Sequence, residues 1–292
     1  MNVDTSVRRI RLQSEGVNFS ALTAGGEGQP WVICLHGIPA SAELWRGVLP
    51  ILAGAGFYAV APDLAGFGET TYENPESTSL SGNADALCRF LVREHPTPIW
   101  WVGHDLGGVV TQLALQRYPE RFSQVTFSNC PFGASWPVPS VRKLRLAARL
   151  GLFPTMAQSG AFTTPLGIAP LKQTFGDPTL LTPAMVDRVF WDSKISSADG
   201  RRAFAHFLCR LDERDYLRKI RSFSSQNKVS QVIWGMKDVH QPWPLVGQPL
   251  AAALGTHHVT QLDGVGHFVP AEAPQAMGAA LVEFGKMTTS RR

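Results

Sequence analysis

The stretch that decides the fold is IWWVGHDLGG, residues 99–108. Its first half is short and continuously apolar, which is typical of a strand that is covered on both faces of a parallel sheet. Its second half places Asp105 among closely spaced glycines, directly before a helical pattern at residues 107–117. A strand, a glycine turn and a helix in this order predict a nucleophile elbow that lifts the Asp105 side chain above the sheet.

Similar apolar runs recur on both sides of this stretch and alternate with helical patterns. Alternating polar and apolar residues at 9–12 and 17–22 predict an opening hairpin. The order of strands and helices predicts an α/β fold with a mostly parallel, doubly wound sheet. The other apolar runs lie at residues 31–35, 58–62, 125–128, 229–234 and 258–262, and the other helical patterns lie at residues 42–53, 80–93 and 272–284.

The alternation of strand and helix patterns stops between residues 131 and 227, where prolines recur and no strand-like run is present. Helical patterns follow one another there, at residues 141–150, 183–191 and 202–223. We therefore expect one core domain, residues 1–130 and 228–292, interrupted by an inserted helical cap at residues 131–227.

Composition excludes several classes of protein. The chain has 292 residues, 44% of them hydrophobic, and its formal charge of +4 is too small and scattered to predict binding of nucleic acid. Four dispersed cysteines favour a reducing compartment. The N-terminus lacks a secretory pattern, and charges or prolines interrupt every long apolar run, so we expect no membrane partner and a soluble, cytoplasmic protein. Composition leaves a monomer and a homodimer equally open.

Two further residues follow later strand patterns. Asp238 ends WGMKD just beyond the run at 229–234, and His267 lies in DGVGHF beyond the run at 258–262. Open α/β sheets place their sites at the carboxyl ends of strands. A single loop histidine or turn aspartate is usually structural. Asp105, Asp238 and His267 together, in the chain order nucleophile, acid, histidine, predict a catalytic triad.

The elbow also predicts how Asp105 would react. The helix N-terminus behind it favours an anion, so Asp105 would be a carboxylate that displaces a leaving group from carbon and forms an ester. The turn HGIP, residues 36–39, follows the strand at 31–35. Its Ile38 amide can join the Leu106 amide as a two-donor oxyanion hole. The structural interpretation of the motif is a tight turn, and both can hold at once.

The motifs HGxP, GHDxGG, WGxxD and GxGHF together resemble the epoxide hydrolase and haloalkane dehalogenase branch of the α/β-hydrolases, over essentially the whole chain. The resemblance implies the α/β-hydrolase fold and an aspartate nucleophile. It implies that Asp105 attacks carbon and that His267, oriented by Asp238, activates water to hydrolyse the ester. It implies no metal and no organic cofactor.

Residues that distinguish the subfamilies are partly missing. Haloalkane dehalogenases usually have a tryptophan after the nucleophile and often an asparagine in the HGxP turn, and here these positions are Leu106 and Ile38. Fluoroacetate dehalogenases place arginines after the aspartate, where this chain has Leu106 and Val109. Dehalogenation is therefore the alternative function, with Trp45, Trp136 or Trp191 as substitute halide donors through their indole N–H groups.

Epoxide hydrolases of this branch use two cap tyrosines to hydrogen-bond the epoxide oxygen. This chain has Tyr216 in its cap, and His206 lies near the second tyrosine position by its distance before Asp238. A histidine on an ordinary amphipathic helix is an equally good interpretation of His206. We expect an epoxide hydrolase that acts on a small, apolar substrate with water as co-substrate. An alternative of another class is a ligand-binding or noncanonical biosynthetic protein on the same scaffold.

Overall fold

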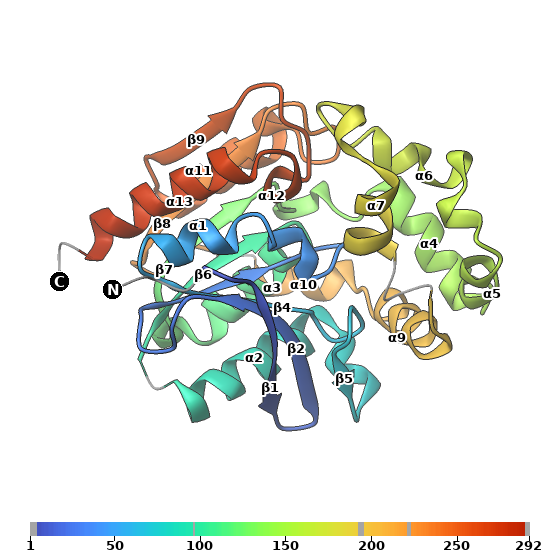
Figure 1. The fold of residues 1–292 in the computed structure, drawn as a ribbon, viewed down its shortest axis with the longest axis horizontal. Helices are drawn as coiled ribbons and strands as arrows, with labels where there is room; N and C mark the ends of the chain where they lie inside the picture. Colours follow the sequence, from blue (N-terminus) through green and yellow to red (C-terminus); the bar gives the residue numbers. More distant parts are fainter. Residues whose placement is uncertain (1–4, 96, 192–195, 221–222, 290–292) are drawn as a thin grey trace.

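A nine-stranded sheet runs through the molecule (Figure 1). The computed structural model describes residues 5–95, 97–191, 196–220 and 223–289. The strand order is β1-β2-β4-β3-β6-β7-β8-β9, and β5 pairs with β2. The strands are β1 Arg8–Ser14, β2 Val17–Ala24, β3 Trp31–Leu35, β4 Tyr58–Pro62, β5 Thr71–Tyr72, β6 Ile99–His104, β7 Phe122–Ser128, β8 Val229–Gly235 and β9 His258–Leu262.

The sheet is parallel from β4 through β9, and β1, β2 and β5 add an antiparallel edge. Every residue of β4 and β6 is buried. Burial on both faces accounts for the continuous apolarity of these strands, because parallel sheets are covered by helices above and below. The predicted α/β-hydrolase fold, with its mostly parallel, doubly wound sheet, is confirmed.

Helices cover both faces of the sheet. In Figure 1, α1 and α13 pack side by side above it, and α2 and α3 pack side by side below it. The N-terminus of α3 lies directly after β6, so the elbow sits near the centre of the sheet. The helices outside the insertion are α1 Leu49–Gly54, α2 Leu80–Glu94, α3 Leu106–Arg117, α11 Gln248–Leu254, α12 Val269–Glu272 and α13 Pro274–Thr289.

Three predicted helices are divided in the structure. The pattern at 42–53 forms a 3-10 helix, Ala42–Trp45, and then α1, which begins beside Pro50 because proline is tolerated in a first helical turn. The pattern at 272–284 divides in the same way at Pro274, between α12 and α13. The pattern at 202–223 forms two helices, because the Asp212 side chain caps the start of the second one. Its residues 221–222 lie outside the described part of the chain.

The described residues between β7 and β8 form helices and no strand, as expected. They lie together at one end of the molecule, and we call this insertion the cap (Figure 1). We propose the division into a core at 1–130 and 228–292 and a cap at 131–227. The cap helices are α4 Pro139–Arg149, α5 Phe153–Gln158, α6 Pro165–Lys172, α7 Pro183–Met185, a π-helical turn Val186–Trp191, α9 Ala198–Cys209 and α10 Glu213–Lys219.

Aromatic side chains attach the cap to the core. Phe67, in the loop after β4, packs edge-on against Phe204 and Phe207 of α9, with ring centroids 5.3 and 4.4 Å apart. All three side chains are buried. Most of the cap aromatics therefore serve packing, as expected. Within the described ranges, no helix combines the length and the apolarity that a bilayer crossing requires.

Candidate active site

Asp105 stands at the elbow between β6 and α3. Its backbone has φ 47° and ψ −124°, a conformation that residues other than glycine rarely adopt. Closely packed backbone surrounds it: a Cβ atom on Gly107 would meet the Leu35 carbonyl oxygen at 2.3 Å, and one on Gly103 would meet Gly108 Cα at 2.6 Å. The glycines therefore allow the turn, and a strained backbone at a functional position is a common means of holding a side chain in place.

The HGxP turn supplies a donor to this carboxylate. The Ile38 amide donates a hydrogen bond of 2.7 Å to Asp105 Oδ2, and the Leu106 amide also supports the carboxylate. Gly37 is required for this approach, because a Cβ atom there would lie 2.2 Å from Asp105 Oδ2. The two amides predicted as an oxyanion hole therefore both support the Asp105 carboxylate.

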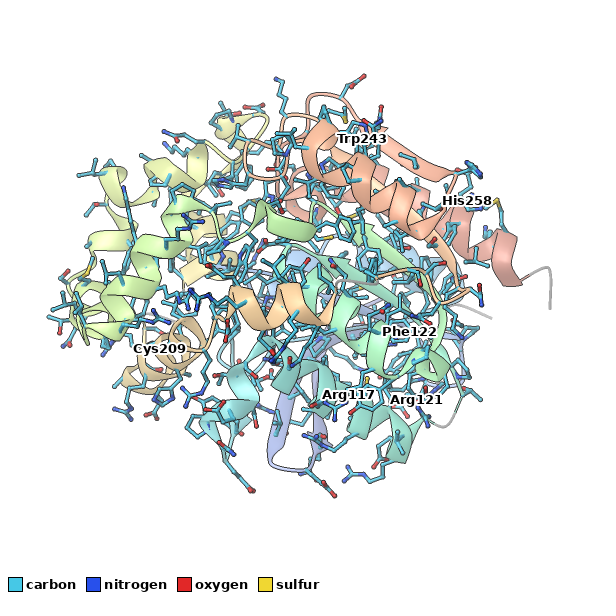
Figure 2. The ribbon with its side chains drawn as sticks, turned by 180° about the vertical axis from the view of Figure 1, so that it is seen from behind. Arg117, Arg121, Phe122, Cys209, Trp243 and His258 are labelled. Carbon is cyan, nitrogen blue, oxygen red and sulfur yellow. The ribbon has the colours of Figure 1, made fainter. Side chains whose placement is uncertain are left out.

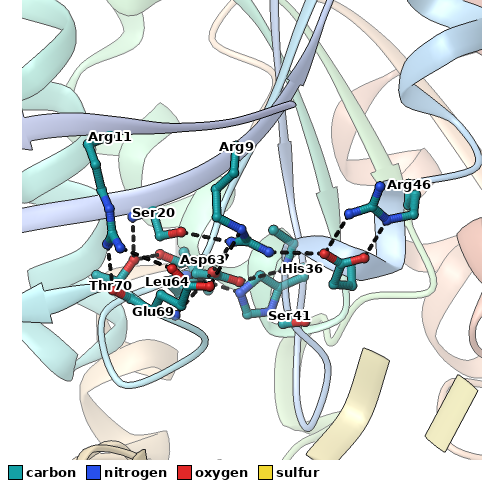
Figure 3. Close-up of polar contacts among 12 residues, drawn as sticks. Arg9, Arg11, Ser20, His36, Ser41, Arg46, Asp63, Leu64, Glu69 and Thr70 are labelled. Carbon is teal, nitrogen blue, oxygen red and sulfur yellow. Dashed lines mark hydrogen bonds and ion pairs between the residues drawn. The ribbon is translucent and has the colours of Figure 1, made fainter. Parts of the chain in front are cut away.

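The loop after β4 anchors the HGxP turn at both ends (Figure 3). The Leu64 amide donates to His36 Nε2 at 3.0 Å, so Nδ1 of His36 carries the proton and faces its own turn at Gly37 O. At the other end, the Ala42 amide donates to Asp63 Oδ1 at 2.7 Å. Asp63 is buried, and Arg9 of β1 lies 3.1 Å from its second oxygen. This network fixes the turn that carries the Ile38 amide.

Asp238 and His267 meet beyond the ends of β8 and β9. Nδ1 of His267 donates to Asp238 Oδ2 at 2.8 Å, which fixes the tautomer and turns Nε2 toward Asp105. Nε2 lies 3.8 Å from Asp105 Oδ1. All three side chains are buried. The arrangement can support nucleophilic attack by a carboxylate, followed by base-assisted attack of water.

Asn129 is a member of this site that sequence reasoning missed. It follows β7 with φ 39°, and its amide donates to Asp238 Oδ2 at 2.8 Å. Its carbonyl oxygen accepts from the Gly235 amide at 2.9 Å, so the side chain bridges the ends of β7 and β8. The backbone amides of His240 and Gln241 donate to Asp238 Oδ1 at 2.8 and 3.0 Å. Both oxygens of the acid are thus held in place.

The pKa values of Asp105, Asp238 and His267 are shifted in ways that favour different protonation states. Burial raises the pKa of Asp105 to about 6, although the nearby His267 charge and the Leu106 and Ile38 amides act to lower it. Burial also opposes charge on Asp238, but the charge and hydrogen bond of His267 and the Asn129 bond hold its pKa well below the usual range. Burial disfavours the His267 imidazolium, yet the charge and hydrogen bond of Asp238, together with Asp105, raise the pKa of His267 to about 9.

A cavity of about 440 Å³ opens over Asp105, and it is large enough for a small organic molecule. Its wall is mainly apolar, and the core contributes Asp105, Ile38 and His267 to it. The cap contributes most of the remaining wall, including Trp136, Val141, Leu144, Phe162, Leu171 and Trp191. A largely hydrophobic substrate, as expected from the sequence, fits this lining.

The two cap donors expected from the sequence do not line this cavity, so that expectation is corrected. His206 is half-buried on α9, and its Nδ1 lies 3.0 Å from the hydroxyl of Tyr72, which belongs to β5 and does not line the cavity. The Tyr216 hydroxyl donates within the core, 2.9 Å from Gln112 Oε1 and 3.1 Å from the Pro131 carbonyl oxygen. Both side chains are committed to packing between cap and core.

The three tryptophans considered as donors divide into two groups. Trp136 and Trp191 line the cavity, whereas Trp45 is buried in the core and does not. No acceptor among the described residues satisfies the indole N–H group of any of the three. Of these three tryptophans, Trp136 and Trp191 are therefore the two whose side chains reach the cavity wall.

His240 lines the cavity although sequence reasoning overlooked it. Its ring packs edge-on against His267, with centroids 5.8 Å apart, and it is half-buried. Burial and the His267 charge lower the pKa of His240 below 6.5, so the ring is neutral at pH 7 and carries one N–H donor. Its position two residues after Asp238 was the feature of the sequence that indicated a place near the site.

The chain is similar to several known hydrolases. Epoxide hydrolase A of Mycobacterium tuberculosis is 24% identical over 94% of this chain and 95% of that protein. Haloalkane dehalogenase 2 of Mycobacterium bovis is 24% identical over 88% of each chain. The fold is also that of haloalkane dehalogenase DbeA from Bradyrhizobium elkani, with a TM-score of 0.79 and 17% identity over 98% of this chain and 100% of that one. Residues 32–280 match the alpha/beta hydrolase family, and the chain belongs to that family.

Proposed function

We propose that this hydrolase attacks an electrophilic carbon of a small apolar substrate with Asp105 and then hydrolyses the resulting ester. One observation carries the proposal: a buried carboxylate at the elbow accepts the Ile38 amide on one oxygen and faces His267 with the other. The names of the relatives, an epoxide hydrolase and a haloalkane dehalogenase, support the same class of reaction.

In the first step, Asp105 Oδ1 forms a bond to the substrate carbon while the bond from that carbon to the leaving group breaks. Oδ1 is the better nucleophile, because the Ile38 amide already binds Oδ2. In the second step, His267 Nε2 takes a proton from water, and the water oxygen attacks Cγ of the ester. Negative charge then develops on Oδ2, where the Ile38 amide stabilises it. Collapse of this intermediate breaks the bond between Cγ and Oδ1, and the alcohol product leaves with the proton of the new carboxyl group, so that Asp105 is a carboxylate again.

The charge on His267 changes between the two steps. In the free enzyme, the Asp105 and Asp238 charges favour the imidazolium. Once Asp105 is an uncharged ester, one of these charges is gone, and the pKa of His267 falls. Ester formation therefore favours the neutral imidazole that the second step requires.

An epoxide is the substrate class that we propose first, with His240 in place of the cap donors. Opening the epoxide leaves an alkoxide on the substrate, and the neutral His240 ring can donate a hydrogen bond that stabilises this oxygen. The His267 imidazolium, which lines the same cavity, holds the proton that the oxygen takes, and in a His267 variant solvent supplies that proton instead. That transfer leaves His267 neutral for the second step, where it regains a proton from water.

A carbon–halogen bond is the second candidate. A departing halide needs hydrogen-bond donors and no proton. Trp136 and Trp191 line the cavity, and their indole N–H groups have no acceptor among the described residues. A halide that reached either indole N–H group would give it the acceptor that it lacks.

Trapping of the ester tests the mechanism for either substrate. His267→Gln keeps the first step and blocks the second, so incubation with styrene oxide or 1-bromobutane should give a one-to-one adduct by intact-mass spectrometry. Peptide mapping should place the adduct on Asp105, and a His267→Gln/Asp105→Asn double variant should give none. An adduct on another residue, or turnover without an adduct, would contradict the proposal.

A further inference from the structure

The excess positive charge, which we described as scattered from the whole sequence, lies in one segment of the cap, residues 131–176, when the charges are counted by segment. This segment contains five basic residues and no aspartate or glutamate. The whole chain has 27 basic and 23 acidic residues, which leaves 22 basic and 23 acidic residues outside the segment. The rest of the protein is therefore close to neutral, and the cap segment is strongly cationic. Its basic residues are Arg142, Lys143, Arg145, Arg149 and Lys172.

The same segment exposes a cluster of large apolar side chains, which we call the leucine patch. Of the eleven exposed large hydrophobic residues in the described part of the chain, five belong to it. Single exposed leucines are ordinary on protein surfaces, but a local concentration indicates an interaction site. The patch consists of Leu146 (58% exposed), Leu150 (63%), Leu152 (52%), Met156 (40%) and Leu166 (85%).

Helix α4 combines both features on its outer face. Its inner face buries Val141 and Ala148. Leu146 is exposed between Arg142 and Arg149, and the apolar row continues into Leu150 at the end of the helix. Apolar side chains flanked by arginine and lysine are typical of helices that lie at a membrane interface. In Figure 2, the cap helices form the end of the molecule opposite His258, and side chains project outward from them.

The leucine patch adjoins the mouth of the active-site cavity. Lys143 and Met156 line the cavity and are exposed to solvent, so the cavity opens on this face. An apolar substrate concentrates in lipid rather than in water. A surface that binds lipid around this opening would bring the cavity to the phase that holds such a substrate.

We propose that this face of the cap docks on an anionic lipid surface, which departs from our expectation from the sequence that there is no membrane partner. The leucine patch enters the acyl boundary, and Arg142, Lys143, Arg149 and Lys172 contact the headgroups. Charge favours this occupant over a second copy of the chain, because pairing two such faces would bring like charges together. Docking does not depend on the chemistry at Asp105; delivery of substrate from the bilayer to the cavity rests on the proposed function.

Vesicle sedimentation tests the docking without any catalytic step. The full-length protein should sediment with vesicles of phosphatidylcholine and phosphatidylglycerol, and much less with phosphatidylcholine alone, at low salt. Each basic side chain near an anionic bilayer contributes roughly fivefold to binding. Arg142→Gln/Lys143→Gln/Arg149→Gln should therefore weaken binding on the order of 10²-fold, and the catalytically inactive Asp105→Asn should bind as wild type does.

The apolar contribution needs its own variants. Leu146→Ser/Leu150→Ser should weaken vesicle binding by roughly tenfold or more, whereas Leu245→Ser, on an equally exposed leucine outside the cap (74%), should leave it unchanged. Circular dichroism would confirm that the variants fold, and Leu166→Ser offers a second site on α6.

Three outcomes would overturn the lipid assignment. The first is a wild-type protein that remains in the supernatant with both vesicle types. The second is a dimer by light scattering that Leu146→Ser/Leu150→Ser dissociates, which would assign the face to a second copy. The third is equally tight binding of polyglutamate and anionic vesicles with no effect of the leucine variants, which would assign the face to an acidic protein partner.

Discussion

Nε2 of His267 lies 3.8 Å from Asp105 Oδ1, while Nδ1 of the same ring donates to Asp238. The first distance is beyond a direct hydrogen bond, so the nucleophile oxygen is near the imidazolium charge without being held by it. Oδ1 therefore remains available for attack on carbon. The gap beside Nε2, which no direct hydrogen bond to Asp105 fills, is where the hydrolytic water would bind in the second step.

The pH dependence of the first step should report Asp105. Its pKa is raised to about 6 by burial, and only the ionised carboxylate attacks. The single-turnover rate of adduct formation in His267→Asn should be constant well above the apparent pKa and fall about tenfold per pH unit below it. Removing His267 also removes its stabilising charge, so the midpoint in this variant should lie at or above 6. Stopped-flow fluorescence with a pH series measures it, and a rate independent of pH between 5 and 8 would contradict a carboxylate nucleophile.

The reaction with an epoxide should depend on His240 and not on His206. His240→Phe removes the N–H donor from the cavity wall, so alkylation by styrene oxide should slow by about 10²-fold. His206→Phe removes a ring that contacts Tyr72 outside the cavity, so kcat/KM should stay within about twofold. Equal loss in both variants would show that the cap is disturbed rather than that a donor is lost. An unchanged rate in His240→Phe would exclude this residue as the donor.

The fold and the central site could be predicted from the sequence for a physical reason. Strands that are buried on both faces must be continuously apolar, so β3, β4 and β6 are visible in the sequence. Parallel topology then brings the carboxyl ends of these strands together. Asp105, Asp238 and His267 follow three such strands, and their predicted convergence agrees with the distances observed.

The cap could not be predicted to the same degree. His206 was placed by its distance before Asp238 in the family pattern, but a distance along the chain does not determine which side of a cap helix faces the cavity, and in the structure His206 contacts Tyr72. Tyr216 contacts Gln112 of α3, a long-range pair that no local pattern indicates. Asn129 gave a weak signal, since it follows β7 at the same sheet edge as the catalytic residues, but an asparagine after a strand is usually a turn residue.

Replacing the nucleophile should stabilise the protein. The folded-state pKa of Asp105, about 6, lies above the ordinary value of 3.8, so the folded protein binds the proton more tightly than the unfolded chain does. Stability is therefore lost as pH rises from about 4 to about 6, and above that range the buried carboxylate is destabilising. Asp105→Asn should raise the free energy of unfolding at pH 7.5 by on the order of 1–3 kcal/mol.

The gain in Asp105→Asn should shrink at pH 4.5, where the wild-type carboxyl is largely protonated. Urea titrations of both proteins at the two pH values give the comparison. A variant that is less stable than wild type at pH 7.5 would show that the His267 attraction outweighs the burial of the Asp105 charge.

The indole donors should separate the two substrate classes. If halide leaves between Trp136 and Trp191, each tryptophan-to-phenylalanine variant should slow release of bromide from 1-bromobutane by about tenfold or more and reduce alkylation by styrene oxide much less. Bromide release is followed with a halide electrode, and adduct formation by mass spectrometry. Equal loss with both substrates would indicate that the tryptophans only shape the cavity.

The close approach of Gly37 to the Asp105 carboxylate gives a direct test of the oxyanion hole. A Cβ atom at residue 37 would lie 2.2 Å from Oδ2, so Gly37→Ala must displace either the HGxP turn or the carboxylate. The Ile38 hydrogen bond would then lengthen, and kcat should fall by 10²-fold or more, as for loss of one oxyanion-hole donor. Gly28→Ala is the matched control, because nothing lies within 4 Å of a Cβ atom there. In Gly28→Ala, both activity and melting temperature should change little. If Gly37→Ala retains full activity with a lowered melting temperature, the HGxP turn serves stability rather than catalysis.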